Sequence, residues 1–170
     1  RIEALLKHDV SLFAYHLPLD VHREFGNNVQ LAKVLGIEID GELAKQNNHP
    51  IGLVGTISED TDFESLKALI ADKLDRQPLA IEGNSKPIRS IAWCTGAAQN
   101  YIELAVAAGV DAYITGEVSE PTVHIARESG IHFFSAGHHA TERYGVQAIG
   151  GHLASKFGIE HQFIDIDNPV

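Results

Sequence analysis

Residues 88–94 read IRSIAWC and residues 112–115 read AYIT, two short apolar runs that are typical of buried β-strands. Between them, apolar side chains recur at helical spacing, and this pattern ends at Gly109. A strand, a helix and a second strand in this order are typical of a βαβ unit with parallel strands. The stretch from residue 88 to residue 115 therefore predicts an α/β fold.

The same alternation of strands and helices continues on both sides of this unit. Further strands are predicted at Val10–Tyr15, Ile51–Ile57, Pro78–Ile81, His132–Ser135 and Gln162–Ile166. Helix starts are predicted at Asn27 or Asn28, at a capping box of Thr61 with Glu64, and at Ser119. Glycines predict the ends of helices at Gly36, Gly130 and Gly158.

A weak internal repeat suggests how the chain is organised. Residues 5–16 parallel residues 126–137, since each segment ends a helix, turns, runs as an apolar strand and leads to His and a carboxylate. Two interpretations stay open, a duplicated domain and chance similarity between two βα units. With duplication, residues 1–45 are the remnant of a first α/β domain, and residues 46–170 form the second, with residues 46–84 as an inserted strand–helix–strand element. The chain opens at Arg1 in an apparent helix and contains no methionine, so we expect an N-terminal truncation.

Composition excludes several classes of protein. The 170 residues carry 13 basic and 23 acidic side chains, a net charge of −10 that disfavours binding to nucleic-acid backbones. No apolar run reaches the ~20 residues that a membrane span needs, so a membrane protein is not expected. One cysteine, Cys94, excludes an internal disulfide and suits a reducing, cytoplasmic location. Ten histidines are the unusual feature, because histidine is the commonest metal ligand.

Two clusters of His and carboxylate residues follow predicted strands. His16 and Asp20 come after the Val10–Tyr15 run, at the strand end where ligand sites form in open α/β sheets. His138 and Glu142 come after the His132–Ser135 run, four residues apart on one face of the last helix. At that spacing an imidazole nitrogen and a carboxylate oxygen can reach one metal ion. The alternatives are a half-buried His16 with Asp20 as a loop residue, and Glu142 at the positive end of a helix.

Glu117 follows the strand at residues 112–115 and has two possible roles. It is either a carboxylate that supports the metal ligands or acts as a general base, or part of the cap of the next helix. Cys94 is interpreted as a small core residue rather than a nucleophile.

Several motifs together resemble the Nif-three-like family, whose bacterial YbgI-type members carry the label GTP cyclohydrolase I type 2 homologue. The motifs lie at both ends of the chain and between them: His16 to Asp20, Gly26-Asn27-Asn28, Ala92 to Gly96, Asp111 to Glu120, Gly137 to Glu142 and Phe163 to Ile166. The resemblance implies two related α/β domains, a dinuclear metal site between them and a toroidal homo-hexamer.

The resemblance also implies which residues bind metal. Asp20, His138 and Glu142 match family ligands, with Glu142 in the bridging position, and His16 matches a polar residue beside two divalent ions. The remaining family ligands are an adjacent His-His pair in an N-terminal segment that this chain lacks. Histidine and carboxylate ligands suit Zn, Fe and Mn alike.

Two functions remain open. The first is a metal-dependent hydrolase acting on a small anionic substrate, with His16 and Glu117 moving protons. The second is a non-catalytic protein, either a carrier that binds and delivers metal or a ring-shaped scaffold. The sequence does not distinguish between them.

Overall fold

The structure is a computed structural model that describes residues 1–46, 49–84 and 86–170. Its centre is a six-stranded sheet in the order β1-β2-β4-β5-β6-β3. The strands are β1 (Ile37–Gln46), β2 (His49–Thr61), β3 (Leu79–Ile81), β4 (Ile88–Cys94), β5 (Ala112–Thr115) and β6 (His132–Ser135). Strands β4, β5 and β6 are parallel to one another, whereas β1, β2 and β3 pair antiparallel with their neighbours. The predicted α/β fold is confirmed.

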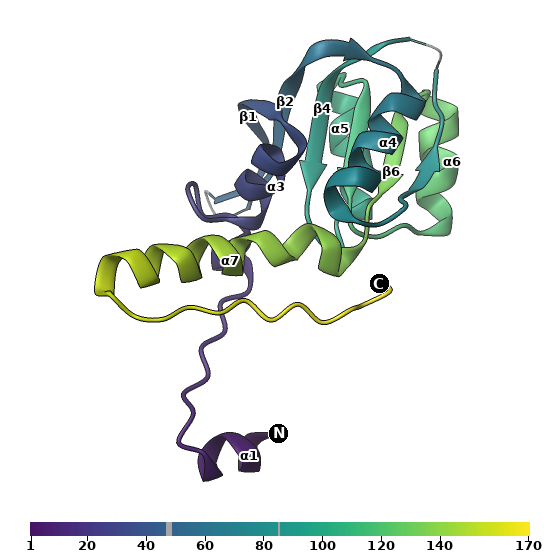
Figure 1. The fold of residues 1–170 in the computed structure, drawn as a ribbon. Helices are drawn as coiled ribbons and strands as arrows, with labels where there is room; N and C mark the ends of the chain where they lie inside the picture. Colours follow the sequence, from purple (N-terminus) through teal and green to yellow (C-terminus); the bar gives the residue numbers. More distant parts are fainter. Residues whose placement is uncertain (47–48, 85) are drawn as a thin grey trace.

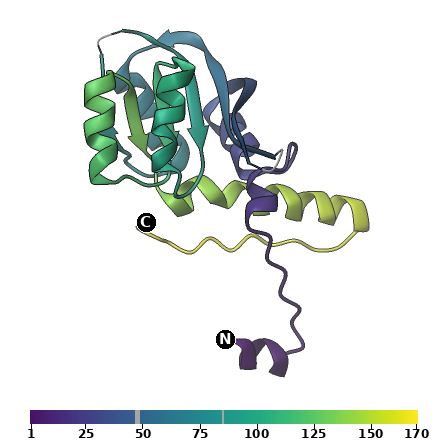
Figure 2. The same ribbon diagram turned by 180° about the vertical axis from the view of Figure 1, so that it is seen from behind.

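Helices cover both faces of the sheet (Figures 1 and 2). One face carries α3 (Asn27–Leu35) and α4 (Phe63–Leu74), and the other carries the 3-10 turn η1 (Gln99–Tyr101) with α5 (Ile102–Ala108) and α6 (Glu120–Ser129). The 20-residue helix α7 (His138–Phe157) runs past the lower end of the sheet (Figure 1). The short helices α1 (Ile2–Lys7) and α2 (Leu17–Asp20) lie in the N-terminal segment, and α1 stands away from the body in both views.

The two faces of β4 explain why the chain builds two cores. Successive strand residues point to opposite sides, so Trp93 packs among residues of α3 and α4 while Ala92 packs among residues of α5 and α6. Trp93 is fully buried, and its indole Nε1 donates a hydrogen bond to the carbonyl oxygen of Asn28 at 2.9 Å. This bond fixes α3 against the centre of the sheet.

Two predicted strands are wrong. Residues 10–15 and 162–166 are extended but pair with no strand of the described chain. A strand needs a neighbouring strand to satisfy its backbone groups, and neither segment pairs with β1 or β3, the edge strands of this sheet. Most apolar side chains in these segments are exposed, with Phe13 at 77% and Ile164 at 70%, whereas Phe163 is half-buried.

Strand β1 was not predicted from the sequence. Its alternation of Ile37 and Ile39 with Glu38 and Asp40 is the signal that identifies it. It forms an antiparallel pair with β2 and carries several register shifts. The predicted division of the chain at residue 45 stays a prediction.

Two predicted helix caps also need correction. The N-cap of α3 is Gly26, and Asn27 and Asn28 lie buried in the first turn, where their side chains contact other segments. The N-cap of α4 is Asp62, whose carboxylate accepts a hydrogen bond from the Ser65 backbone N–H at 2.7 Å. Asp62 directly follows Thr61, so the predicted capping box was displaced by one residue.

The other predicted helix boundaries are confirmed. Ser119 caps α6 together with Thr122. The glycines that follow α3, α5, α6 and α7 have left-handed backbone conformations, which suit a residue without a side chain: Gly36, Gly109, Gly130 and Gly158.

Asp111, just before β5, provides a pH-dependent link between β4 and β5. Its Oδ2 accepts hydrogen bonds from the backbone N–H of Arg89 and from the N–H and hydroxyl of Ser90. Burial raises the pKa of Asp111, but these hydrogen bonds outweigh that effect and leave the pKa below its ordinary value. The ionised form is therefore stabilised by folding.

We expect Asp111→Asn to destabilise the fold by roughly 1 kcal/mol at pH 7, because the charged acceptor is lost. A depressed pKa contributes stability above the ordinary aspartate value, and this contribution is lost as the pH falls through the folded pKa. The difference from the parent protein in urea unfolding should therefore shrink below about pH 4. An equal difference at pH 7 and pH 3 would contradict this role.

Candidate metal centre

The site lies where parallel strands β5 and β6 end and α7 begins. Strand β5 leads to Gly116 and Glu117, and β6 leads through Gly137 to His138. The Gly137 N–H donates to the Gly116 carbonyl oxygen at 3.0 Å, so the two loops are joined. Carboxyl ends of parallel strands share one edge of the sheet, which is where open α/β folds place ligands.

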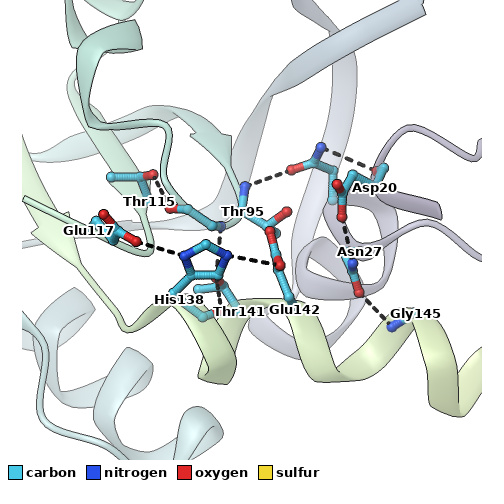
Figure 3. A network of polar contacts seen from close by, with 11 residues as sticks. Asp20, Asn27, Thr95, Thr115, Glu117, His138, Thr141, Glu142 and Gly145 are labelled. Carbon is cyan, nitrogen blue, oxygen red and sulfur yellow. Dashed lines mark hydrogen bonds and ion pairs between the residues drawn. The ribbon is translucent and has the colours of Figure 1, made fainter. Parts of the chain in front are cut away.

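His138 stands between two carboxylates (Figure 3). Its Nδ1 is 2.7 Å from Glu117 Oε1, and its Nε2 is 3.1 Å from Glu142 Oε2. Burial lowers the pKa of His138, but the hydrogen bond to Glu117 and the charges of Glu142 and Glu117 outweigh it and raise the pKa overall. Both carboxylates therefore favour a positive charge at this ring.

A close approach of the β4–α5 turn fixes the position of Glu142. Gly96 has a φ of +70°, and a Cβ placed there would overlap Glu142 Oε1 and lie 3.1 Å from His138 Nε2. The Gly96 N–H donates to the Thr141 hydroxyl at 3.1 Å. A side chain at position 96 would occupy the space in which the Glu142 carboxylate lies.

Asp20 reaches the same region from the N-terminal part of the chain. Asn27 Nδ2 donates to Asp20 Oδ1 at 2.7 Å, while Asn27 Oδ1 accepts from the Gly145 N–H of α7 at 2.8 Å. Asn28 holds the other side, since its Nδ2 donates to the Asp20 carbonyl oxygen and its Oδ1 accepts from the Thr95 N–H. Two asparagine side chains thus tie Asp20 to α7 and to the residue after β4. Figure 3 shows Asn27 between Asp20 and Gly145.

The carboxylates of Asp20 and Glu142 influence each other. Burial raises the pKa of Glu142, and the negative charge of Asp20 raises it further, whereas His138 and His16 lower it. Burial likewise raises the pKa of the Cys94 thiol to about 12, with the charges of Asp20 and Glu142 adding to the effect. Negative charge gathered in a half-buried place is an environment that a cation would stabilise.

The donor set fits a divalent ion in its chemistry but is incomplete in its geometry. Two atoms that each lie about 2.1 Å from one ion at roughly a right angle are about 3 Å apart, close to the Nε2–Oε2 distance of 3.1 Å. Glu117 holds Nδ1 in the way carboxylates orient metal-bound histidines. Among the residues that the structure describes, however, no three His, Cys, Asp or Glu side chains are close enough to surround an ion.

Comparison with known proteins places the chain in a family. Residues 1–169 match the family described as Duf34/NIF3 (NGG1p interacting factor 3). This chain belongs to the DUF34/NIF3 family. Among curated DUF34/NIF3 relatives, the GTP cyclohydrolase 1 type 2 homolog of Pseudomonas aeruginosa is 57% identical over 170 residues, covering 100% of this chain and 67% of the relative. The protein of the same description from Vibrio cholerae is 50% identical over 174 residues, covering 100% of this chain and 68% of the relative.

Solved structures agree with this assignment. The protein ybgI, described as being of unknown function, has a TM-score of 0.93 and 44% identity, covering 99% of this chain and 67% of its own. TTHA1606 from Thermus thermophilus has a TM-score of 0.83 and 27% identity, covering 99% of this chain and 66% of its own. This chain spans about two thirds of these DUF34/NIF3 proteins. Reduced HcgD from Methanocaldococcus jannaschii, at 23% identity, shows the shared fold alone.

The predicted site residues of this DUF34/NIF3 chain fall into two groups. Glu117, His138 and Glu142 form one chain of contacts, and Asp20 lies beside it, held by asparagines. His16 is exposed at the N-cap of α2, close enough to affect the pKa of Glu142 but without a side-chain hydrogen bond among the described residues. The alternative in which Glu117 caps a helix is wrong, because Ser119 fills that position.

The structural role of Asn27 and Asn28 was not predicted from the sequence. Both were interpreted as candidate helix caps, and their side chains instead connect Asp20 to segments far along the chain. Two consecutive asparagines at a helix start that also match a family motif were the only available signal.

Glu117 offers a test of how His138 is oriented. We expect Glu117→Ala to weaken divalent-metal affinity about 10- to 100-fold, because the imidazole loses the partner that fixes its direction. Glu117→Gln should lose less, since its amide oxygen still accepts a hydrogen bond from Nδ1. Competition against a metal-sensitive dye measures both affinities. An affinity of Glu117→Ala within twofold of the parent would show that Glu117 does not support the ligand.

Proposed function

We propose that this chain supplies Asp20, His138 and Glu142 to a dinuclear divalent-metal centre of a hydrolase. The observation that carries the proposal is His138, whose Nδ1 contacts Glu117 while its Nε2 faces Glu142 at a distance that two ligands of one ion would have. An adjacent His-His pair expected in an N-terminal segment would complete the ligand set.

Each proposed site residue of this chain has a defined part in the proposed reaction. Bound divalent ions would lower the pKa of a water molecule and polarise the substrate. Asn27 orients Asp20, and Glu117 orients His138 rather than acting as a free base, because its Oε1 is already engaged. His16 is exposed at the edge of the site and is the residue available to carry protons to and from solvent.

The substrate class is proposed only broadly, as a small anionic compound. The name GTP cyclohydrolase 1 type 2 homolog belongs to the relatives, and no contact among the residues described by the structure is specific for a nucleotide. The metal is Zn, Fe or Mn, all of which accept histidine and carboxylate ligands.

The test uses the full-length protein. Elemental analysis should find two divalent ions per chain, and the metal-loaded protein should hydrolyse at least one of three classes of substrate: GTP, phosphoesters and cyclic amides. Removing the metal with a chelator should abolish the turnover, and adding it back should restore it. If no substrate is turned over faster than by Glu142→Ala, the hydrolase proposal is rejected.

A metal-delivery protein is the second candidate, and the exposure of the site favours it. The side chain of His138 is 35% exposed and that of Glu142 is 23% exposed, so ions held there would be open to exchange. A carrier should pass its metal to a competing apo-protein soon after mixing, whereas a catalytic centre should retain it. Stopped-flow measurement of metal transfer distinguishes the two.

We further propose that residues 1–45 belong to a first α/β domain and that the protein forms a homo-hexameric ring in the cytoplasm. The apolar side chains exposed at residues 10–15 and 162–166 support a covering by additional protein surface. Among the described residues, no helix is both long and apolar enough to span a membrane. Light scattering of the full-length protein tests the assembly, and a monomer would contradict it.

A further inference from the structure

A second polar cavity adjoins the candidate metal centre. It measures about 320 Å³ and lies between the end of α4, the start of α7 and the C-terminal segment that follows α7. Arg76, His139 and Arg143 line it. It shares His139, Arg143 and Asn168 with a larger cavity of about 560 Å³ whose walls include His138 and Glu142. The two cavities are therefore neighbours.

Arg76 is the unusual residue of this cavity. Its side chain lies across Gly137, where a Cβ would be 2.6 Å from the guanidinium Nε. Within the part of the chain that the structure describes, this Nε is buried and has no hydrogen-bond partner. A guanidinium stays charged at every physiological pH, and an unsatisfied buried donor on such a group calls for an acceptor. Gly137, which the Arg76 side chain approaches, directly precedes His138 and is the N-cap at the positive amino end of the 20-residue helix α7.

The carboxylate already present in the cavity does not satisfy Arg76. Asp165 pairs with Arg143 at 2.9 Å and with His139 at 3.1 Å. Asp75 and Asp167 also line the cavity and are exposed, as Asp165 is, but among the described residues neither of them forms an ion pair with Arg76. Asp165 thus pairs with His139 and with Arg143, whose Nη2 also donates to the Leu74 carbonyl oxygen. Arg76 is left without a carboxylate partner among the described residues. A dianion with three or four oxygens could contact both arginines.

We propose that this cavity binds a phosphate group of the substrate, with Arg76 as its anchor. The inference rests on the proposed function and narrows it: the substrate is a phosphorylated small molecule whose reacting part reaches the His138–Glu142 side. Arginine suits this task because its planar fork of donors matches phosphate oxygens. Asp165 contacts Nη1 of Arg143 and Nε2 of His139, so its carboxylate would compete with a phosphate for these two donors.

The experiment measures inorganic phosphate binding to the metal-free full-length protein by calorimetry and by ³¹P NMR. We expect saturable binding that Arg76→Gln weakens about tenfold or more, the typical cost of one charge-assisted contact. Arg76→Lys keeps the charge but not the fork and should lose less. Asp165→Asn should strengthen binding, because a competing negative charge is removed. Arg127→Gln, an exposed arginine on α6, is the matched control and should change nothing.

The outcomes separate this inference from the metal proposal. Phosphate binding that depends on Arg76 in a protein that binds no metal keeps the anion site and removes the metal centre. The inference is overturned if phosphate binding is not saturable, or if Arg76→Gln binds phosphate as tightly as the parent protein does. It is also overturned if Glu142→Ala lowers phosphate affinity and Arg76→Gln does not. Acetate that binds as tightly as phosphate also overturns it. Thermal unfolding of each variant verifies that it is folded.

Discussion

Replacing Glu142 with alanine is expected to lower the affinity of the full-length protein for divalent metal by at least about 100-fold, more than loss of an outer partner such as Glu117. Glu142 is the only carboxylate among the described residues within hydrogen-bonding distance of His138 Nε2. In the proposed centre Glu142 would be a metal ligand, so its loss would remove a donor directly. Hydrolytic turnover of any substrate found by the screen should fall with the metal.

The control is Glu128→Ala, which removes an exposed glutamate from α6, a helix that supplies no residue to the site. It should leave metal content unchanged. Glu142→Ala itself should remain folded, because the half-buried carboxylate has a raised pKa and its removal relieves its repulsion with Asp20. Metal content at the parent level in Glu142→Ala would remove this residue from the ligand set.

Replacing Asn28 with alanine is expected to have the second largest effect, a loss of roughly 3 kcal/mol of folding stability. The side chain is 3% exposed and makes two hydrogen bonds, one from Asn28 Nδ2 to the Asp20 carbonyl oxygen and one to Asn28 Oδ1 from the Thr95 N–H. Alanine would leave the buried Thr95 donor without a partner, which costs about 1–3 kcal/mol, and would open a small cavity as well. Urea unfolding measures the change.

A second consequence distinguishes Asn28 from an ordinary core residue. Asp20 would lose one of the two asparagine side chains that hold it in place. We therefore expect metal affinity to fall about tenfold, as it does when other residues that orient a metal ligand are removed. Asn100→Ala, at an exposed position of η1, is the matched control for both measurements. A stability loss below about 1 kcal/mol would show that water replaces the amide group without penalty.

Periodicity and glycine placement were sufficient to predict most of the fold. The βαβ unit from β4 to β5 is visible because the last four residues of β4 and all four of β5 are buried on both faces and are mostly apolar. The left-handed glycines that end α3 and α6 are local signals and needed no tertiary information. The local sequence pattern gave wrong predictions for two strands, because a strand forms by pairing with a segment that can be far away in the sequence. Residues 10–15 and 162–166 have strand composition, yet a strand exists only when another strand binds it.

The candidate site divides in the same way. His138 and Glu142 share a helix face by spacing alone, and the sequence itself therefore determined their contact, the α/β class and the glycine-ended helices. Tertiary structure alone decided that Glu117 reaches His138 across 21 residues and that Asn27 joins Asp20 to Gly145 across 118 residues. It also placed Arg76 against Gly137. The physical reason is that a hydrogen bond between distant segments depends on how the helices pack on the sheet, and no short-range pattern encodes that packing.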